Sequence, residues 1–321
     1  MNARTPLFLS RRHLVGGLVA TALPLPVRAQ ARKPARSQLE YPSTDLAYFD
    51  KPITPSPFPI AFGCAAISWH QGPRPAVEEI SEAGFLGIQL MPNAMKEWSD
   101  PLVLKAELAK RHLTLVTFSG GNPSDVTDVD KEVEALMVKA NYARQAGAYY
   151  FQITSPNREH GTSPTRLKAL AKIVDEVGKR TSALGMRVGF HNHIDQLVET
   201  TAELDALLAA TNPKNVGLLL DVGHCRAAGG DPAAVIRKHS KRLVMLHLKD
   251  VQMPANNERG ANFVPLGQGA VDFPAVFAAL ERIKYRGWAI IELDSPPQGI
   301  SPLSATQESK RFVEQTLQVK I

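Results

Sequence analysis

Short apolar runs alternate with amphipathic stretches along the chain from about residue 59 to its end. We predict the apolar runs as strands and the amphipathic stretches as helices, because each has the periodicity of that element. The eight predicted strands are 60–69, 86–91, 113–119, 148–155, 186–193, 216–221, 242–250 and 288–294. The predicted helices are 75–83, 101–111, 130–146, 164–183, 201–210, 232–239, 273–284 and 305–317.

This alternation predicts a parallel sheet covered by helices, since buried parallel strands are continuously apolar. Eight such units over residues 59–321 match a (β/α)₈ TIM barrel, which we predict as a single catalytic domain. The alternative is an open doubly wound sheet, which would carry a glycine-rich phosphate turn after its first strand. No G-x-G-x-x-G occurs there, so the barrel is favoured.

The first 31 residues have the pattern of an export signal. Arg11 and Arg12 precede a short apolar stretch over 14–25, and small residues follow it. The stretch is too short to span a bilayer, so we expect no stable membrane insertion. The arginine pair favours the twin-arginine route and a periplasmic or otherwise exported protein; the alternative is a cytoplasmic protein with a disordered start. Residues 32–58 are rich in proline and polar groups, and we predict an extended arm there.

The net charge of the chain bears on whether a nucleic-acid partner is expected. The net charge of +6 falls to +2 without residues 1–31, which hold four arginines and no acid. Since no basic run with interleaved aromatics appears later, we expect no nucleic-acid partner. The two cysteines, Cys64 and Cys225, are expected to be independent of each other, one in a strand and one in a loop. A homo-oligomer is compatible with the sequence.

Four successive predicted strands end in residues that can bind a metal ion. The fifth ends "FHNH", the sixth "LLLD", the seventh "LHLKD" and the eighth "IIELD", which places His191 or His193, Asp221, His247 and Glu292 at one rim of the barrel. A buried charge is costly unless it is paired or bound to metal. Mixed imidazole and carboxylate ligands suit one Mn²⁺, Co²⁺, Zn²⁺ or Fe²⁺ ion rather than calcium.

Each of these residues also has a structural explanation. An aspartate after a strand is often a helix N-cap, and a lone histidine at a strand end is often only hydrogen-bonded. The coincidence of four strands favours the metal site.

Other residues near the strand ends are candidates for substrate binding. They are His224, Lys249, Gln152 and His70. Lys249 can stabilise a developing enolate or pair with a neighbouring carboxylate, and His224 can fix Asp221. The loop 155–163 carries Arg158, Glu159 and His160, which we expect to be solvated.

The segments "DVGH", "HLKD" with a following "LGQGAVDF", and "IIELD" resemble the sugar phosphate isomerase/epimerase superfamily with its xylose isomerase-like barrel. That superfamily includes tagatose 3-epimerases, hydroxypyruvate isomerase and inosose dehydratase. The resemblance covers about 60–320 and is most specific over 186–294. It implies that Asp221, His247 and Glu292 hold one divalent metal and that His224 contacts substrate or a second metal.

The strand-five position departs from the commonest family pattern, because His191 stands where many members have glutamate. Members resembling inosose dehydratase have a similar histidine-rich strand. Epimerases of this family use two carboxylates, so the loss of one weakens the epimerase interpretation and shifts the balance slightly toward elimination.

The resemblance implies a metal-dependent isomerase or epimerase acting on a sugar, keto-sugar or polyol through an enediolate. Glu292, His191 or His193 would move the proton. The alternative is a dehydratase or lyase acting on a keto-sugar, inosose or 3-keto-glycoside. A phosphorylated substrate is not expected, because no phosphate loop is visible. Two other classes stay open: an endonuclease IV-like phosphodiesterase, disfavoured by the low net charge, and a non-catalytic exported sugar-binding barrel.

Overall fold

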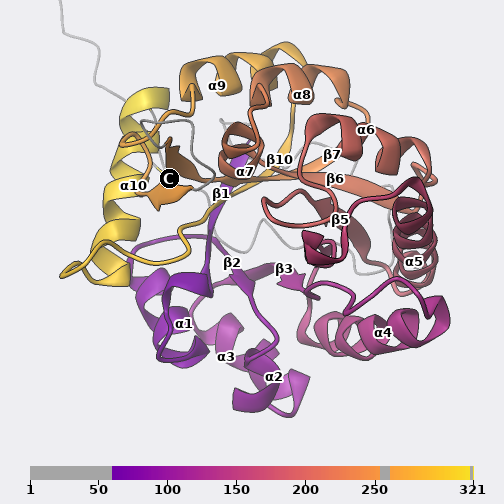
Figure 1. The fold of residues 1–321 in the computed structure, drawn as a ribbon. Helices are drawn as coiled ribbons and strands as arrows, with labels where there is room; N and C mark the ends of the chain where they lie inside the picture. Colours follow the sequence, from indigo (N-terminus) through magenta and orange to yellow (C-terminus); the bar gives the residue numbers. More distant parts are fainter. Residues whose placement is uncertain (1–59, 254–260, 319–320) are drawn as a thin grey trace, which may run out of the picture. The chain divides into compact units, whose positions relative to one another are not determined.

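Eight parallel strands close into a barrel in the computed structural model, which describes residues 60–253, 261–318 and 321 (Figure 1). Their order around the barrel is β1-β10-β7-β6-β5-β4-β3-β2. The barrel strands are β1 Ile60–Ala65, β2 Gly87–Leu90, β3 Thr114–Ser119, β4 Tyr150–Ile153, β5 Arg187–His191, β6 Val216–Asp221, β7 Leu243–Leu248 and β10 Gly287–Ile291. Each lies within or overlaps a predicted strand, so the predicted fold class is confirmed.

Helices surround the barrel and return the chain from the end of one strand to the start of the next (Figure 1). They are α1 Pro73–Glu82, α2 Ala94–Glu97, α3 Pro101–Lys110, α4 Val129–Ala146, α5 Pro164–Ala183, α6 Thr201–Ala209, α7 Val222–Ala227, α8 Pro232–Lys238, α9 Phe273–Arg282 and α10 Pro302–Leu317, with 3-10 turns η3 Ala66–Ser68 and η4 Arg158–His160. Side-chain caps start most of them. Thr200 and Glu203, for example, form a reciprocal capping box at α6. The short α2 and α7 were not predicted, because neither is long enough to show helical periodicity.

The interior of the barrel is filled by apolar side chains below the strand ends. Val116, Leu219, Met245 and Trp288 belong to one buried cluster there. Gly87 lies against it, and a Cβ at this position would meet Trp288 and Val116 at 2.5 Å. This packed layer forms a floor beneath the carboxyl ends of the strands, which is the end at which the active sites of TIM barrels lie.

A short antiparallel hairpin, β8 Asp250–Gln252 and β9 Asn262–Val264, follows β7 and was not predicted. The buried Asp250 carboxylate organises the chain around it by accepting hydrogen bonds from the backbone N–H groups of Val251, Gly267, Gly269 and Val271 at 2.8–3.1 Å. Asp250 thereby ties the "LGQGAV" segment to the end of β7.

Some predictions lie outside the part of the chain that the structure describes. The export signal over 1–31 and the arm over 32–58 are among them. Within the described residues, no helix has the length and apolar character needed to cross a membrane. Cys64 and Cys225 are both free and buried, as expected of independent cysteines. The loop prediction for Cys225 is wrong, since it lies in α7.

Candidate metal centre and active site

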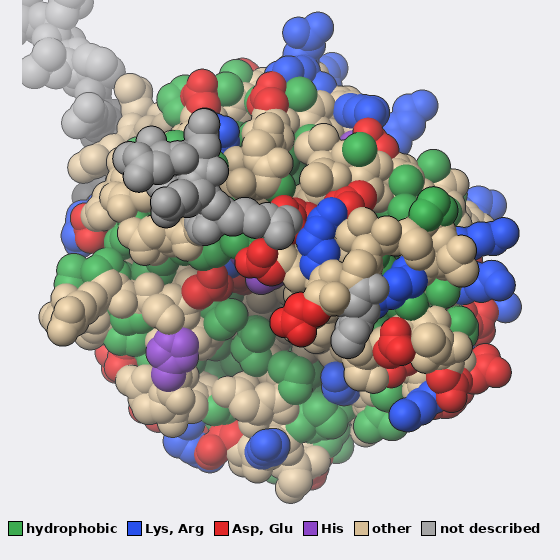
Figure 2. Space-filling model, in the orientation of Figure 1, with side chains coloured by type: hydrophobic (Ala, Val, Ile, Leu, Met, Phe, Trp, Pro, Cys, Tyr) green, Lys and Arg blue, Asp and Glu red, His purple; other side chains and the backbone are tan. Residues whose placement is uncertain are grey.

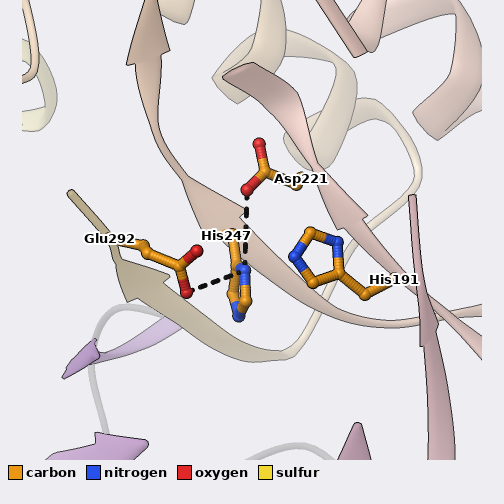
Figure 3. Close-up of side chains that lie close together, drawn as sticks. All are labelled: His191, Asp221, His247 and Glu292. Atoms are coloured by element: carbon orange, nitrogen blue, oxygen red, sulfur yellow. Dashed lines mark ion pairs between the residues drawn. The ribbon is translucent and has the colours of Figure 1, made fainter. Parts of the chain in front are cut away.

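Four buried side chains from neighbouring strands converge at the carboxyl end of the barrel. His191 ends β5, Asp221 ends β6, His247 lies near the end of β7 and Glu292 follows β10. One ligand atom of each lies within 4.8 Å of the others, and Figure 3 shows the four side chains facing a common centre. The parallel register pairs Asp221 with His247, which explains why residues far apart in sequence meet.

The donor atoms of this cluster fit a metal ion. His191 Nδ1, Asp221 Oδ2 and His247 Nδ1 are buried and make no hydrogen bond within the described part of the chain. His247 Nδ1 lies 3.1 Å from Glu292 Oε2 and 3.6 Å from Asp221 Oδ2 (dashed lines in Figure 3). Unsatisfied buried polar atoms are rare in proteins. A divalent cation among two imidazoles and two carboxylates would satisfy them all.

Asp221 combines its two expected roles. Its Oδ1 accepts a hydrogen bond from the backbone N–H of His224 at 2.8 Å and so caps α7, whereas Oδ2 faces the cluster. The metal-ligand and N-cap hypotheses are therefore compatible, because each uses a different oxygen.

The structure distinguishes the two histidines of strand five. His191 belongs to the four-residue cluster. His193 lies two residues beyond it, is half-buried, and packs against His224 with ring centroids 3.8 Å apart. Asn192 lies between His191 and His193 in the sequence. It forms two hydrogen bonds with the backbone of Asp221, at 2.9 and 3.1 Å, and so ties β5 to β6.

Burial and neighbouring charges set the protonation of the cluster. Burial, and then His247, lower the pKa of His191 to about 3, so its ring is neutral at pH 7. Burial alone would raise the pKa values of Asp221 and Glu292, but the neighbouring side chains of His247, Lys249 and His191 lower both. Two anions and a neutral imidazole are the states in which these groups bind metal.

Lys249 lies beside the cluster and is fully buried. Its Nζ is 2.9 Å from Glu292 Oε1, 2.8 Å from Asp294 Oδ1 and 3.1 Å from His224 Nε2. Burial alone would lower its pKa, yet Glu292, Asp221 and Asp294 raise it, so the side chain is an ammonium. The predicted salt bridge to a neighbouring carboxylate is therefore present.

The other candidates differ in their surroundings. Gln152, in β4, is buried, and its Oε1 makes no hydrogen bond among the described residues. His70 is exposed, and its Nε2 lies 3.0 Å from Ser295 Oγ. Arg158 does not fit the expected solvated loop, because it pairs with Glu203 at 2.6 Å and Glu199 at 3.3 Å.

Three residues near the cluster were not predicted as site residues from the sequence. Gln89, in β2, hydrogen-bonds both Glu292 and His247. Asp294 pairs with Lys249, and Phe263 of β9 lies 4.7 Å from the Lys249 ammonium and 4.7 Å from the His224 ring. Gln89 did carry a signal, since it is a polar residue in the otherwise apolar "GIQL".

The molecular surface is hollowed on the face drawn in Figure 2. Figure 2 shows a hollow near the centre of the molecular face, where acidic side chains gather and a histidine is visible deeper in. The four cluster side chains lie below the surface, since none is more than 4% exposed.

Comparisons with known proteins agree with this geometry. The chain is 26% identical to an inosose dehydratase from Lacticaseibacillus casei over 297 residues, which are 81% of this chain and 98% of the relative. It is 30% identical to the rhizopine catabolism protein MocC from Rhizobium meliloti over 252 residues, 71% of this chain and 76% of the relative. The inosose dehydratase relative favours the dehydratase alternative over the isomerase or epimerase that the sequence predicted first.

Solved structures show the same fold at lower identity. The IOLI protein, solved with a zinc atom, superposes with a TM-score of 0.70 at 17% identity and covers 80% of this chain and 98% of its own. L-ribulose 3-epimerase superposes with a TM-score of 0.67 at 19% identity and covers 81% and 95%. A profile described as the xylose isomerase-like TIM barrel matches residues 77–316. The chain therefore belongs to the xylose isomerase-like TIM barrel family, which confirms the predicted resemblance.

Proposed function

We propose that the protein is a metal-dependent dehydratase that removes water from a cyclic keto-polyol of the inosose class. The similarity to inosose dehydratases over most of the chain supports the class of reaction. The observation that carries the proposal is that Glu292 is an ionised carboxylate whose two oxygens both accept hydrogen bonds. Lys249 donates to its Oε1 and Gln89 to its Oε2, and its pKa is lowered. Such a carboxylate is a good ligand and a poor base, so carboxylate-mediated epimerisation is disfavoured.

His191, Asp221, His247 and Glu292 would hold the ion. When bound, it would supply a Lewis acid that polarises the substrate carbonyl and acidifies the neighbouring C–H bond.

His193 is the proton carrier. Its Nδ1 contacts the Ile194 carbonyl oxygen, which can only accept, so Nδ1 carries the hydrogen and Nε2 is left as the basic nitrogen. Nε2 takes the proton from the carbon next to the carbonyl. The same proton is then delivered to the hydroxyl on the next carbon, which leaves as water while the carbon–carbon double bond forms. His193 returns to its starting state, so atoms and charges balance.

Lys249 stabilises the negative charge that develops on substrate oxygen during proton removal. A fixed ammonium in a site from which water is largely excluded is effective in this role, because it needs no reorganisation when the charge appears. Its three carboxylate neighbours keep it charged.

Gln152 orients the polyol. Its Oε1 lacks a hydrogen-bond donor among the described residues, and the strand register pairs it with Gly189, two residues before His191. A substrate hydroxyl can supply the missing donor. Phe263 provides an apolar wall on the side of Lys249 and His224.

The test is incubation of the full-length protein with Mn²⁺ or Co²⁺ and an inosose in D₂O, followed by mass spectrometry. A dehydratase yields a product lighter by one water. An epimerase or isomerase instead yields a product of unchanged formula in which one carbon-bound hydrogen is exchanged for deuterium. Asp221→Asn serves as the control without a complete ligand set. Exchange without water loss would overturn the dehydratase proposal and restore the isomerase or epimerase hypothesis.

A further inference from the structure

Gln89 connects two residues of the cluster through one amide group. Its Nε2 lies 3.1 Å from Glu292 Oε2, and its Oε1 lies 2.8 Å from His247 Nε2. Gln89 is 1% exposed, so water does not compete for either contact.

The direction of both hydrogen bonds follows from the chemistry of the groups. An ionised carboxylate can only accept, so the amide NH₂ must face Glu292. The amide oxygen then faces His247, and a carbonyl oxygen can only accept, so His247 Nε2 must carry the hydrogen. His247 Nδ1 is left with a lone pair directed toward Asp221 Oδ2 and Glu292 Oε2.

We propose that Gln89 is a positioning residue that selects the tautomer of His247 and thereby makes Nδ1 the nitrogen that binds the metal. The same amide holds Glu292 Oε2 toward the cluster. Groups that orient metal ligands in this way commonly change metal affinity by about 10–100-fold when removed. The inference rests on the proposed metal site but not on the proposed dehydratase reaction.

Metal affinity of three variants tests the proposal. Gln89→Met keeps the length of the side chain and removes both hydrogen bonds, so we expect Zn²⁺ and Co²⁺ to bind about 10–100-fold more weakly. Gln89→Glu keeps an acceptor for His247 but loses the donor to Glu292. Gln152→Met is the matched control, since Gln152 is also a buried glutamine of a barrel strand; its metal affinity should equal that of the wild type. Affinity is measured by competition with a chromophoric chelator.

A crystal structure of the zinc-loaded wild-type protein supplies an independent readout. The ion is expected next to His247 Nδ1, with Nε2 directed at Gln89, and the Gln89→Glu variant should keep this geometry. Zinc bound to Nε2, or Gln89→Met with wild-type affinity, would overturn the role of Gln89. The wild-type structure decides the question even if Gln89→Met fails to fold. A wild-type protein that binds no metal at all would instead overturn the proposed metal site, so the two failures are distinguishable.

Discussion

Lys249 Nζ lies 2.9 Å from Glu292 Oε1, so a buried ammonium directly contacts one of the four candidate metal ligands. The pair places a fixed positive charge at the edge of the cluster without using a ligand atom that faces its centre. Nζ is also 3.7 Å from Asp221 Oδ2. Metal and lysine therefore share the negative charge of the same two carboxylates, and each is expected to influence the other.

Removal of the Lys249 charge should separate catalysis from metal binding. We expect Lys249→Met to lower kcat by about 10²–10³-fold, because a preorganised charge that stabilises the transition state is lost. Metal affinity should stay the same or rise, since a neighbouring cation is gone. Steady-state kinetics and metal titration check both. Lys110→Met is the control, as the Lys110 side chain is 73% exposed. Loss of metal from Lys249→Met would show that the lysine acts by organising the ligands.

The two histidines of strand five should respond differently to substitution. His193→Gln should retain stoichiometric metal and lose about 10²–10⁴-fold in kcat, the usual contribution of a proton-transfer group. His191→Phe should lose the metal, because a ligand is replaced by a ring with no donor atom. Elemental mass spectrometry measures the metal content of both variants, and steady-state kinetics measures their kcat. If the His193 variant were fully active, its role as the proton carrier would be rejected.

Asp250 should matter for stability although it is not one of the four cluster residues. Asp250→Asn replaces a carboxylate that accepts four backbone hydrogen bonds by an amide with one accepting atom. We expect a loss of about 1.5–3 kcal/mol in the free energy of unfolding. Denaturant unfolding measures it. Asp272→Asn, at the N-cap of α9, should be nearly neutral, because asparagine caps helices as well as aspartate does. Equal effects of the two substitutions would contradict the assigned role.

The metal-free protein should lose stability in acid. The pKa of His191 in the folded protein is about 3, below the usual value of 6.5, so the unfolded chain takes up this proton first as the pH falls. The lowered pKa values of Asp221 and Glu292 add a loss at lower pH. The free energy of unfolding should therefore decrease from about pH 6.5 toward pH 3. In His191→Phe the decrease between pH 6.5 and 4.5 should be smaller; an unchanged profile would argue against a buried neutral His191.

Much of the fold was predictable because the barrel strands have a local signature. Continuous apolar runs such as "VGLLLD" are buried on both faces, and the intervening helices carry caps and prolines at their starts. The point at which each run meets a polar residue marks the end of the strand. Asp221, His247 and Glu292 were predicted in this way, since the ends of parallel strands always meet at one rim.

The choice between His191 and His193 required the tertiary structure. Residues two apart on a strand share a face, so periodicity alone cannot separate them. Their different neighbours do. His191 lies beside Asp221 of β6, His247 of β7 and Glu292, which follows β10. His193 has passed the end of β5 and meets His224 of α7.

The amino-acid sequence by itself determined the barrel, its family and three of the four clustered side chains, because these follow from patterns within single segments. Only the tertiary structure decided which atoms meet. The amide of Gln89 on β2 reaches His247 across 158 positions of the chain, and Lys249, directly after β7, reaches Asp294 beyond the end of β10. The directions of these hydrogen bonds and the pairing of these charges depend on distances between residues far apart in the sequence. Closure of the barrel sets those distances, whereas the periodicity of single segments does not.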